Sequence, residues 1–304
     1  MTMTKPCPIS VVLPTYNGLD LLQRHLPSVM VYSGADDIII IDDASSDDTV
    51  SWLKAHYPQV NIIANRRNQG FADSVNLGFT RAKNNLVLLL NNDVSLEKHT
   101  VYHLLSHFSN PDVFAVGAQE ILPDGSTRGR STGSFQRGLF VHTSITPSLP
   151  GPTMWVFAAS GLFNKSLWRQ LNGLDPLFKP AYWEDIDIGY RAWKAGFICL
   201  YEPKAKLYHQ VESTMTKHLG AQKSTIAFRN QLLFFWKNIT SPSLIVNHIL
   251  WLPYHLTLTT IRSRGAFLLG FIKALLMLTQ IRRSPTSLMT DQQVILKAST
   301  NEPT

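Results

Sequence analysis

A run of five aliphatic residues that ends in three small polar residues constrains the fold of this chain more than any other stretch. Leu86–Leu90 is apolar at every position, and Asn91, Asn92 and Asp93 follow it directly. A strand that is apolar on both faces belongs at the centre of a parallel sheet covered by helices. The carboxyl ends of such strands are where open α/β folds bind their ligands. The stretch therefore predicts a binding site beside these three polar residues.

The polar residues that end this run admit two interpretations. Amide and carboxylate oxygens are hard ligands of the kind that Mg²⁺ and Mn²⁺ prefer, so Asp93 would bind a divalent metal ion that carries a phosphate-bearing ligand. Asn and Asp also favour turns and helix starts, so the same residues could form only a capping turn. The remaining motifs favour the metal site.

Strand and helix patterns alternate along the first third of the chain. Predicted strands cover residues 9–13, 37–41, 60–64 and 86–90, and predicted helices cover residues 19–31, 47–57 and 71–82. This alternation predicts an α/β fold with a mostly parallel sheet and helices on both faces. Gly70 and Gly78 do not have the spacing of a dinucleotide-binding fingerprint, which argues against a Rossmann dehydrogenase.

Tyr16, Asp43 and Asp93 each follow the end of a different predicted strand. The carboxyl ends of parallel strands meet at one edge of a sheet, so we expect these side chains to lie close together. An aromatic ring and a carboxylate suit a nucleobase, through stacking and hydrogen bonding. Each residue alone could be an ordinary surface or turn residue, but the three together favour a nucleotide site.

Four motifs occur in the order seen in family 2 glycosyltransferases. They are Ser10–Asn17 (SVVLPTYN), Ile40–Thr49 (IIDDASSDDT), Asn68–Ala72 (NQGFA) and Leu90–Asp93 (LNND). The resemblance covers about the first four-fifths of the chain and is strongest to the rhamnosyltransferase-like branch that builds bacterial surface polysaccharides. It implies a GT-A fold, a nucleotide-diphosphate sugar donor and a divalent metal, Mg²⁺ or Mn²⁺.

The resemblance also implies roles for single residues of the donor site. The positions that would hold the nucleotide sugar are Pro14, Thr15, Tyr16, Asn17, Asp43, Gly70 and Asn92, with the base against Pro14 to Tyr16 and Asp43 and the ribose facing Asn92. Asp93 matches the residue that binds the metal on the diphosphate. Many members have two Asp in this motif, so the single carboxylate of Asn92–Asp93 implies weaker metal binding.

Three carboxylates, Glu184, Asp185 and Asp187, stand near the start of a predicted helix. They could be only favourable charges at a helix N-terminus. Glycosyl transfer with inversion, however, needs a carboxylate that takes the proton of the acceptor hydroxyl. Asp185 matches the residue that supplies this base in the family, with Glu184 as a supporting neighbour. Asp187 is the competitor, and we expect it to be structural.

His209 and Arg229 complete the predicted site. A lone histidine is more often structural than a ligand. In the family a His followed by small hydroxyl residues, here Ser213 and Thr214, completes the metal or diphosphate site, which implies His209 as a metal ligand. Arg229 and Asn230 also match a family pair, and Arg229 is expected to contact a phosphate.

Residues 122–153 are rich in Gly, Ser, Thr and Pro and carry Arg128, Arg130 and Arg137. Long irregular loops inside compact domains are usually functional or disordered. The segment is therefore interpreted either as an acceptor-side flap whose arginines meet a phosphate or as a mobile surface loop.

Two apolar segments, residues 244–261 and 266–281, follow, each too short or too polar to span a membrane comfortably. They are flanked by Arg262, Arg264, Arg282 and Arg283. This pattern favours an in-plane helical hairpin on an anionic membrane surface, so residues 244–283 are predicted to bind membrane. The alternative is a buried helical pair, docked on the catalytic domain or forming a homodimer contact.

The predicted domains are a GT-A catalytic domain at 1–238, with a nucleotide-sugar half at about 1–120 and an acceptor half at about 121–238. Basic apolar helices at 239–284 and a polar, partly disordered end at 285–304 follow. Two cysteines exclude a disulfide framework, and residues 1–8 lack the apolar core of a signal peptide. These features predict a cytoplasmic protein, peripherally associated with the inner face of the membrane.

The net charge of +7 suits anionic partners. The sequence shows no basic patch interleaved with aromatic residues, so nucleic-acid binding is not predicted. The sequence thus predicts an inverting, metal-dependent glycosyltransferase with a lipid-linked or polysaccharide acceptor. Two alternatives stay open. A sugar nucleotidyltransferase would need a Gly-rich basic phosphate loop, which residues 13–18 lack. In a non-catalytic nucleotide-binding membrane module, the carboxylates would be structural.

Overall fold

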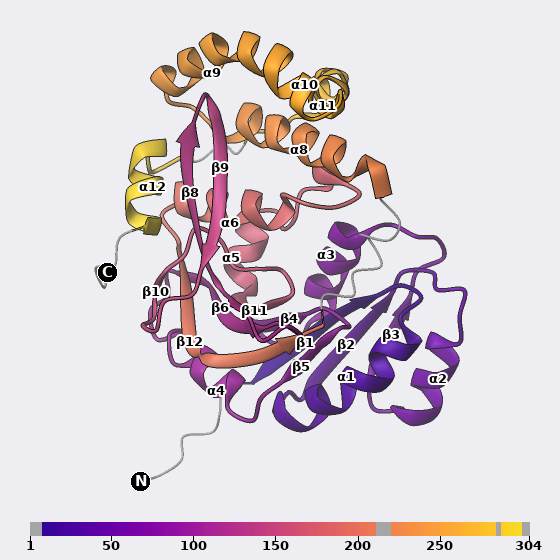
Figure 1. Ribbon diagram of the computed structural model, residues 1–304. Coiled ribbons are helices and arrows are strands. Elements are labelled where there is room, and N and C mark those ends of the chain that lie inside the picture. The colour runs from indigo at the N-terminus through magenta and orange to yellow at the C-terminus, as the bar shows by residue number, and fades with distance from the viewer. Residues whose placement is uncertain (1–7, 211–219, 284–286, 300–304) are drawn as a thin grey trace.

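The computed structural model describes residues 8–210, 220–283 and 287–299 (Figure 1). Within these ranges ten strands form one mixed sheet, and two further strands form a separate hairpin. The order along the main path of the sheet is β10-β12-β6-β11-β4-β1-β2-β3. The strands are β1 (Ile9–Thr15), β2 (Asp37–Asp42), β3 (Asn61–Ala64), β4 (Leu86–Leu90), β5 (Val94–Leu96), β6 (Val113–Ile121), β7 (Thr127–Arg128), β10 (Gly151–Pro152), β11 (Ser160–Asn164) and β12 (Ile198–His209), and the hairpin pairs β8 (Arg130–Gln136) with β9 (Leu139–Ile145).

Helices cover both faces of the sheet (Figure 1). They are α1 (Leu19–Tyr32), α2 (Thr49–His56), α3 (Phe71–Arg81), α4 (Thr100–Leu105), α5 (Lys165–Gln170), α6 (Glu184–Lys194), α8 (Lys223–Asn238), α9 (Pro242–Tyr254), α10 (Thr260–Arg262), α11 (Ala266–Leu275) and α12 (Asp291–Ser299). Alternate residues of each central strand enter opposite cores. In β1, Val12 packs with α3 on one face, whereas Val11 and Leu13 pack with α1 on the other. Apolar residues are therefore needed at every position of these strands.

The sheet is mostly parallel, as the alternation predicts, but its centre contains an antiparallel strand. β1 runs parallel to β2 and β4, and β12 runs parallel to β6, whereas β11 lies antiparallel between β4 and β6. Two features bring distant parts of the chain together at one end of this sheet. Residues 94–96, after Asp93, pair with β12 as the short strand β5, and α4 begins only at Thr100. β12 is one long strand with an irregularity between Glu202 and Lys206.

The prediction of an irregular segment at 122–153 was wrong. Four strands lie there, and the β8–β9 hairpin is paired along its whole length. The small residues have a packing role: a Cβ on Gly129 would lie 2.2 Å from the Tyr201 ring, and one on Gly133 would lie 2.2 Å from the Phe140 ring. The glycines therefore bring strands close to aromatic rings instead of loosening the chain.

The helices α9 and α11 pack on α8, on the side of the molecule away from α1 and α2 (Figure 1). Phe267, Gly270 and Ala274 form the buried face of α11, and a Cβ on Gly270 would lie 2.9 Å from the Thr225 carbonyl of α8. Their outer faces stay apolar and exposed: Leu250 and Leu276 are 73% and 75% exposed. Within the described ranges, no helix combines the length and the apolar character needed to cross a membrane.

The expected disorder at residues 285–304 does not extend to α12, which docks on α6 and β8. Its first residue, Asp291, is fully buried and accepts hydrogen bonds from the Tyr190 hydroxyl (2.7 Å), the Lys194 ammonium (3.0 Å) and the Ser241 amide (2.7 Å). Val294 is also fully buried. The buried carboxylate of Asp291 thus fixes the position of α12, whose polar sequence predicts disorder.

Replacing Asp291 with Asn should lower the free energy of unfolding by about 3–5 kcal/mol, because the Lys194 ammonium would be left buried without a counter-charge. Thermal and urea unfolding would measure this. Asp48→Asn, at an exposed helix N-cap, is the matched control and should change little. Equal stability of the two variants would contradict the docked position of α12.

Candidate functional site

The carboxyl ends of β1, β2 and β4 bring three sequence motifs to one edge of the sheet. The Asp43 amide donates to the Thr15 carbonyl (2.8 Å), and the Asn92 side-chain amide donates to the Thr15 hydroxyl (3.0 Å). A Cβ on Gly18 would lie 2.2 Å from the Asn92 amide nitrogen, so only glycine fits at this position of the turn after β1. The predicted convergence of these motifs is confirmed.

Asp43 organises the loop that closes this edge. Its carboxylate accepts hydrogen bonds from the Asn65 side chain and from the amides of Gln69 and Gly70, each at 2.8 Å. Gly70 takes a φ of +87°, which favours glycine. A carboxylate has about four acceptor positions, so one remains for a ligand after these three bonds. Binding of the base by Asp43 and Gly70 stays a prediction.

The other donor-site residues of the first loop surround the same edge. The Asn17 side-chain oxygen accepts from the Ser46 amide (2.7 Å) and so links the β1 and β2 loops. Pro14 is buried, and the Tyr16 ring is half-buried. The structure therefore assigns Asn17 a role in shaping the loop, and it leaves part of Tyr16 accessible to a ligand.

Strand pairing between β5 and β12 brings His209 beside Asp93. His209 lies opposite Val94 in this antiparallel pair, and the Asp93 carbonyl accepts from the Gln210 amide (3.0 Å). The His209 Nε2 atom is 3.2 Å from Asp93 Oδ1. Both side chains are about 95% buried or more. The pair expected from the family resemblance is therefore in contact. Ser213 and Thr214 lie outside the described residues.

Glu120 is a site residue that the sequence analysis missed. It is fully buried at the end of β6, and its Oε2 atom lies 2.8 Å from His209 Nδ1. Arg128, which faces it across the β6–β7 ladder, donates to the same oxygen (2.6 Å), and the Ser160 hydroxyl donates to Oε1 (2.5 Å). The only available signal was an acidic residue near the end of a largely apolar strand.

The electrostatics of this group follow from its contacts. Burial alone would raise the pKa of Glu120, but the hydrogen bond and charge of His209 and the charge of Arg128 lower it to about 2. Burial would lower the pKa of His209, whereas its bonds to Asp93 and Glu120 raise it to about 9. In the metal-free protein, the imidazolium is therefore held between two carboxylates.

Asp93 and His209 fit a divalent metal ion. Asp93 Oδ1 is buried, and apart from its 3.2 Å contact with His209 Nε2 it has no hydrogen-bond partner among the described residues, so a divalent ion can replace the proton between these two groups. Glu120 holds the other imidazole nitrogen, as carboxylates commonly do behind a histidine ligand. In the described ranges, no three His, Cys, Asp or Glu side chains form a complete metal site. Two protein ligands suit ions that a substrate diphosphate coordinates as well.

The helix α6 places Glu184 and Asp185 in its first turn, where the helix dipole favours negative charge. Withdrawal from solvent raises the pKa of Asp185, although the Ile186 amide and the charge of Arg128 lower it. Burial also raises the pKa of Glu184, and repulsion by Asp185 adds to it. The Glu184 Oε2 atom is buried without a hydrogen-bond partner among the described residues. Raised carboxyl pKa values are typical of catalytic acids and bases.

Asp187 is structural, as expected. It is fully buried and bonds to Arg191 Nε (2.7 Å), Lys237 Nζ (2.9 Å) and the Asn238 amide (2.8 Å). Burial would raise the pKa of Asp187, but Arg191 and Lys237 hold it below its ordinary value. This carboxylate is fully occupied in joining α6 to α8.

Arg229 and Asn230 hold the loop that leads into α6. The Asn230 amide nitrogen donates to the carbonyls of Phe178 (2.8 Å), Ala181 (3.0 Å) and Tyr182 (2.8 Å), and Arg229 donates to the Lys179 carbonyl. Two non-glycine residues there, Tyr182 and Trp183, have φ values of +73° and +80°. Such conformations cost about 1–3 kcal/mol each and persist only when the surroundings enforce them.

Asn230 supplies much of that enforcement, so Arg229 and Asn230 together position the start of α6. From the sequence we expected only a phosphate contact by Arg229. The structure adds a role for both residues, which is to hold the loop before α6. That contact stays a prediction.

Replacing Glu120 with Gln should weaken Mn²⁺ binding about 10- to 100-fold, because His209 loses the carboxylate that orients it. Electron paramagnetic resonance of free Mn²⁺ would measure this. Glu202→Gln is the matched control, since Glu202 forms the same kind of 2.8 Å contact with His107, outside the site. Equal Mn²⁺ affinity of the two variants would contradict the assigned role of Glu120.

Asp185 and Asp187 should separate in their effect on stability. Asp187→Asn leaves Arg191 and Lys237 buried with too little counter-charge and should cost about 3–5 kcal/mol. Asp185→Asn should cost nothing or stabilise slightly, because it removes a charge that burial disfavours. Urea unfolding of both variants measures the difference, and a larger loss for Asp185→Asn would reverse the two assignments.

Solved structures share this fold. GalNAc-T7 with UDP, GalNAc and Mn²⁺ aligns with a TM-score of 0.63 and 15% identity over 93% of this chain, and this chain spans 59% of that one. Residues 1–349 of S. aureus TarS, in complex with UDP-GlcNAc, align with a TM-score of 0.61 and 13% identity over 88% of this chain and 81% of that one. These likenesses confirm the expected GT-A fold.

The sequence itself is similar to curated proteins. The N-acetylglucosaminyl-diphospho-decaprenol L-rhamnosyltransferase of Mycobacterium tuberculosis is 27% identical over 257 residues, which are 72% of this chain and 83% of that protein. It agrees with the rhamnosyltransferase-like branch that the motifs indicate. The family model described as glycosyl transferase family 2 matches residues 10–168, just over half of the chain. The protein therefore belongs to glycosyl transferase family 2.

Proposed function

We propose that this protein is an inverting, metal-dependent glycosyltransferase. It would move a hexosyl or deoxyhexosyl group from a nucleotide-diphosphate donor to a lipid-linked or polysaccharide acceptor in cell-envelope glycan synthesis. The observation that supports this most strongly is the pairing of Asp93 with His209 at the edge where the donor motifs meet. Asp185 lies near enough to Glu120 and Arg128 of the same cluster for their charges to influence its pKa.

Asp185 would act as the general base. It takes the proton of the acceptor hydroxyl as that oxygen attacks the anomeric carbon, and the bond from this carbon to the diphosphate breaks. One displacement inverts the configuration and needs no covalent enzyme intermediate. Partial withdrawal from solvent raises the pKa of Asp185 and so makes its carboxylate a stronger base. Glu184, with its raised pKa, would stay protonated and limit the negative charge beside the base.

The donor diphosphate would lie at Asp93 and His209. A divalent ion bound there would offset the charge that builds on the departing diphosphate. Arg128, which is one-third exposed and stacks its guanidinium 5.1 Å from the Phe157 ring centre, would contribute a second positive charge. The base would rest on Pro14, Thr15 and Tyr16, and Asn92 would face the ribose.

The acceptor is proposed from the relative and from the helices at the C-terminal side. The mycobacterial relative is named for a diphospho-decaprenol acceptor, which is lipid-linked. The exposed apolar faces of α9 and α11 are flanked by basic residues, and such faces bind anionic membrane surfaces. We therefore propose peripheral association through residues 244–283. The same helices also pack on α8. The alternative of a helical pair docked on the rest of the protein therefore holds for their inner faces.

Membership of the family leaves little support for a sugar nucleotidyltransferase. A non-catalytic nucleotide-binding module would have the same fold, and the role of Asp185 distinguishes it from an enzyme. Asp185→Asn should reduce turnover about 10²- to 10⁴-fold while donor affinity stays within about twofold. Glycosyl transfer and nucleotide binding, measured on the same preparation, test this. Unchanged turnover would favour the non-catalytic alternative.

The pH dependence of turnover should report the same group. Activity requires ionised Asp185, so it should fall as the pH drops through the raised pKa of this carboxyl, above the usual range of aspartate. Arg128→Gln should move that limb to higher pH, because the charge of Arg128 lowers the pKa. The pH profile of kcat measures both effects. A limb that moves to lower pH in Arg128→Gln would contradict the assignment.

Binding of UDP-, dTDP- and GDP-sugars should reveal one donor whose affinity depends on Mn²⁺. Asp93→Asn should lose that dependence, because it removes the only carboxylate of the proposed metal pair. Calorimetry with and without Mn²⁺ measures this, and Asp43→Asn serves as a comparison that should weaken the nucleotide without removing its metal dependence. Metal-independent binding by the unaltered protein would contradict the proposed cofactor.

A further inference from the structure

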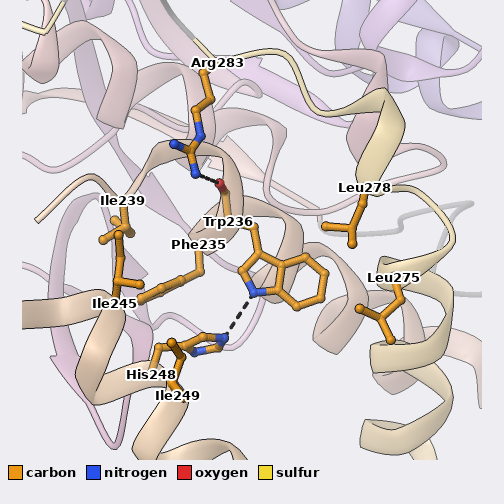
Figure 2. A pocket seen from close by; sticks show the side chains of 9 residues that line it. All are labelled: Phe235, Trp236, Ile239, Ile245, His248, Ile249, Leu275, Leu278 and Arg283. Atoms are coloured by element: carbon orange, nitrogen blue, oxygen red, sulfur yellow. Dashed lines mark hydrogen bonds between the residues drawn. The ribbon is translucent and has the colours of Figure 1, made fainter. Parts of the chain in front are cut away.

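An apolar crevice opens between α8, α9 and α11 (Figure 2). It has a volume of about 300 Å³, and its walls include Phe235 and Trp236 of α8, Ile245 and Ile249 of α9, and Leu275 of α11. That volume is at the lower limit of small-molecule sites. It suits one extended hydrocarbon segment better than a whole lipid or a sugar.

The polar groups of the crevice are satisfied by one another. The Trp236 indole N–H donates to His248 Nε2 at 3.1 Å (Figure 2). His248 Nδ1 lies 2.7 Å from the Gly138 carbonyl. The Arg283 guanidinium donates to the Trp236 carbonyl (3.1 Å). Burial also lowers the pKa of His248, which agrees with a neutral ring in this position. Apart from the other N–H groups of Arg283 at the edge, the polar side chains described here have partners, which favours an apolar occupant inside the crevice.

Arg283 connects this crevice to a second, more polar cavity of about 410 Å³. Arg282 and Lys237 also line that cavity. Its carboxylate, Asp175, is already paired with Lys237 at 2.5 Å. Arg282 makes no hydrogen bond or ion pair within the described part of the chain, and its side chain is exposed. An apolar slot therefore adjoins a cavity with two exposed arginines at its edge.

The surface of α9 and α11 around the crevice is apolar and carries no Asp or Glu. Ile249, Leu250 and Leu276 are 60%, 73% and 75% exposed. No Asp or Glu occurs anywhere from residue 213 to residue 290 of the sequence, whereas residues 239–283 contain five basic residues. This charge distribution complements an anionic lipid surface and disfavours a second copy of the same basic face.

We propose that the crevice binds one hydrocarbon chain of an anionic glycerophospholipid, whose phosphate group is bound by Arg282 and Arg283. This inference rests on the proposed membrane association and deepens it. In this arrangement one lipid chain leaves the bilayer and enters the crevice. The contact of Arg282 and Arg283 with the phosphate then sets the position of the catalytic domain above the headgroups.

Trp236 is a built-in reporter of this contact, because its ring lines the crevice. The exposed Trp251 of α9 would also sense the bilayer, so the experiment uses the full chain with Trp251→Phe. Tryptophan fluorescence is measured on vesicles of phosphatidylglycerol and phosphatidylcholine whose chains carry bromine, a contact quencher. We expect quenching by the brominated chains, and Trp236→Phe in the same background should abolish that quenching.

Two matched pairs of variants separate the crevice from the general surface. Leu275→Phe narrows the crevice, whereas Leu276→Phe adds the same bulk to the neighbouring exposed position outside it. At equal bound fraction, the first should lose most of the quenching and the second should keep it. Arg283→Gln and Arg264→Gln each remove one exposed charge, so each should weaken vesicle binding about fivefold. Only Arg283→Gln should also reduce chain quenching.

The results test the hydrocarbon-chain site separately from the membrane association on which it rests. Vesicle binding without quenching of Trp236 would overturn the chain site and leave membrane association intact. Absence of binding to anionic vesicles would overturn both, and a dimer that buries α9 and α11, detected by light scattering, would then account for the apolar face. Neither result would affect donor binding at Asp93 and His209, which calorimetry measures separately.

Discussion

The contact between His209 and Asp93 is the interaction on which the site depends. It exists because a short strand after Asp93 pairs with the end of β12, so that residues separated by more than a hundred positions lie 3.2 Å apart. Glu120 then fixes the imidazole from behind, and Arg128 and Ser160 fix Glu120. Each layer of this arrangement comes from a different strand. The sheet thus brings polar residues from distant parts of the sequence into one group, which we propose binds the metal ion and the diphosphate.

The part of the site that carries Asp185, the proposed base, is held in a different way. Asp185 stands at the start of α6, and the residues before it adopt left-handed backbone conformations that cost free energy. Asn230 and Arg229 of α8 hold the carbonyls of this loop, and Lys237 of the same helix binds Asp187. α8 in turn carries α9 and α11, whose outer faces are apolar. One helix, α8, therefore connects the position of the proposed base to the surface that we propose for the membrane.

The sequence predicts those parts of the site that depend on local patterns. Asp43 and Asp93 follow apolar strands, and α6 shows its own periodicity, so their elements and the structural role of Asp187 could be assigned from neighbours along the chain. Glu120 could not, because its importance comes from contacts with Arg128, Ser160 and His209 across three strands. The β8–β9 hairpin was missed because its small residues resemble those of a loop. In the structure Gly129, just before the hairpin, packs against the ring of Tyr201, and Gly133 packs against the ring of Phe140 on the paired strand. The α12 helix depends on one buried carboxylate that composition does not reveal.

The central claim is that Asp93 and His209 form the metal end of a sugar-nucleotide site. Crystals grown with Mn²⁺ and the nucleoside diphosphate of the preferred donor would test it directly, because anomalous scattering at the manganese edge locates the ion without assumptions about the protein. We expect one strong anomalous peak in contact with Asp93 Oδ1 and His209 Nε2, next to the diphosphate. A bound diphosphate with the manganese peak elsewhere, or with none, would contradict it.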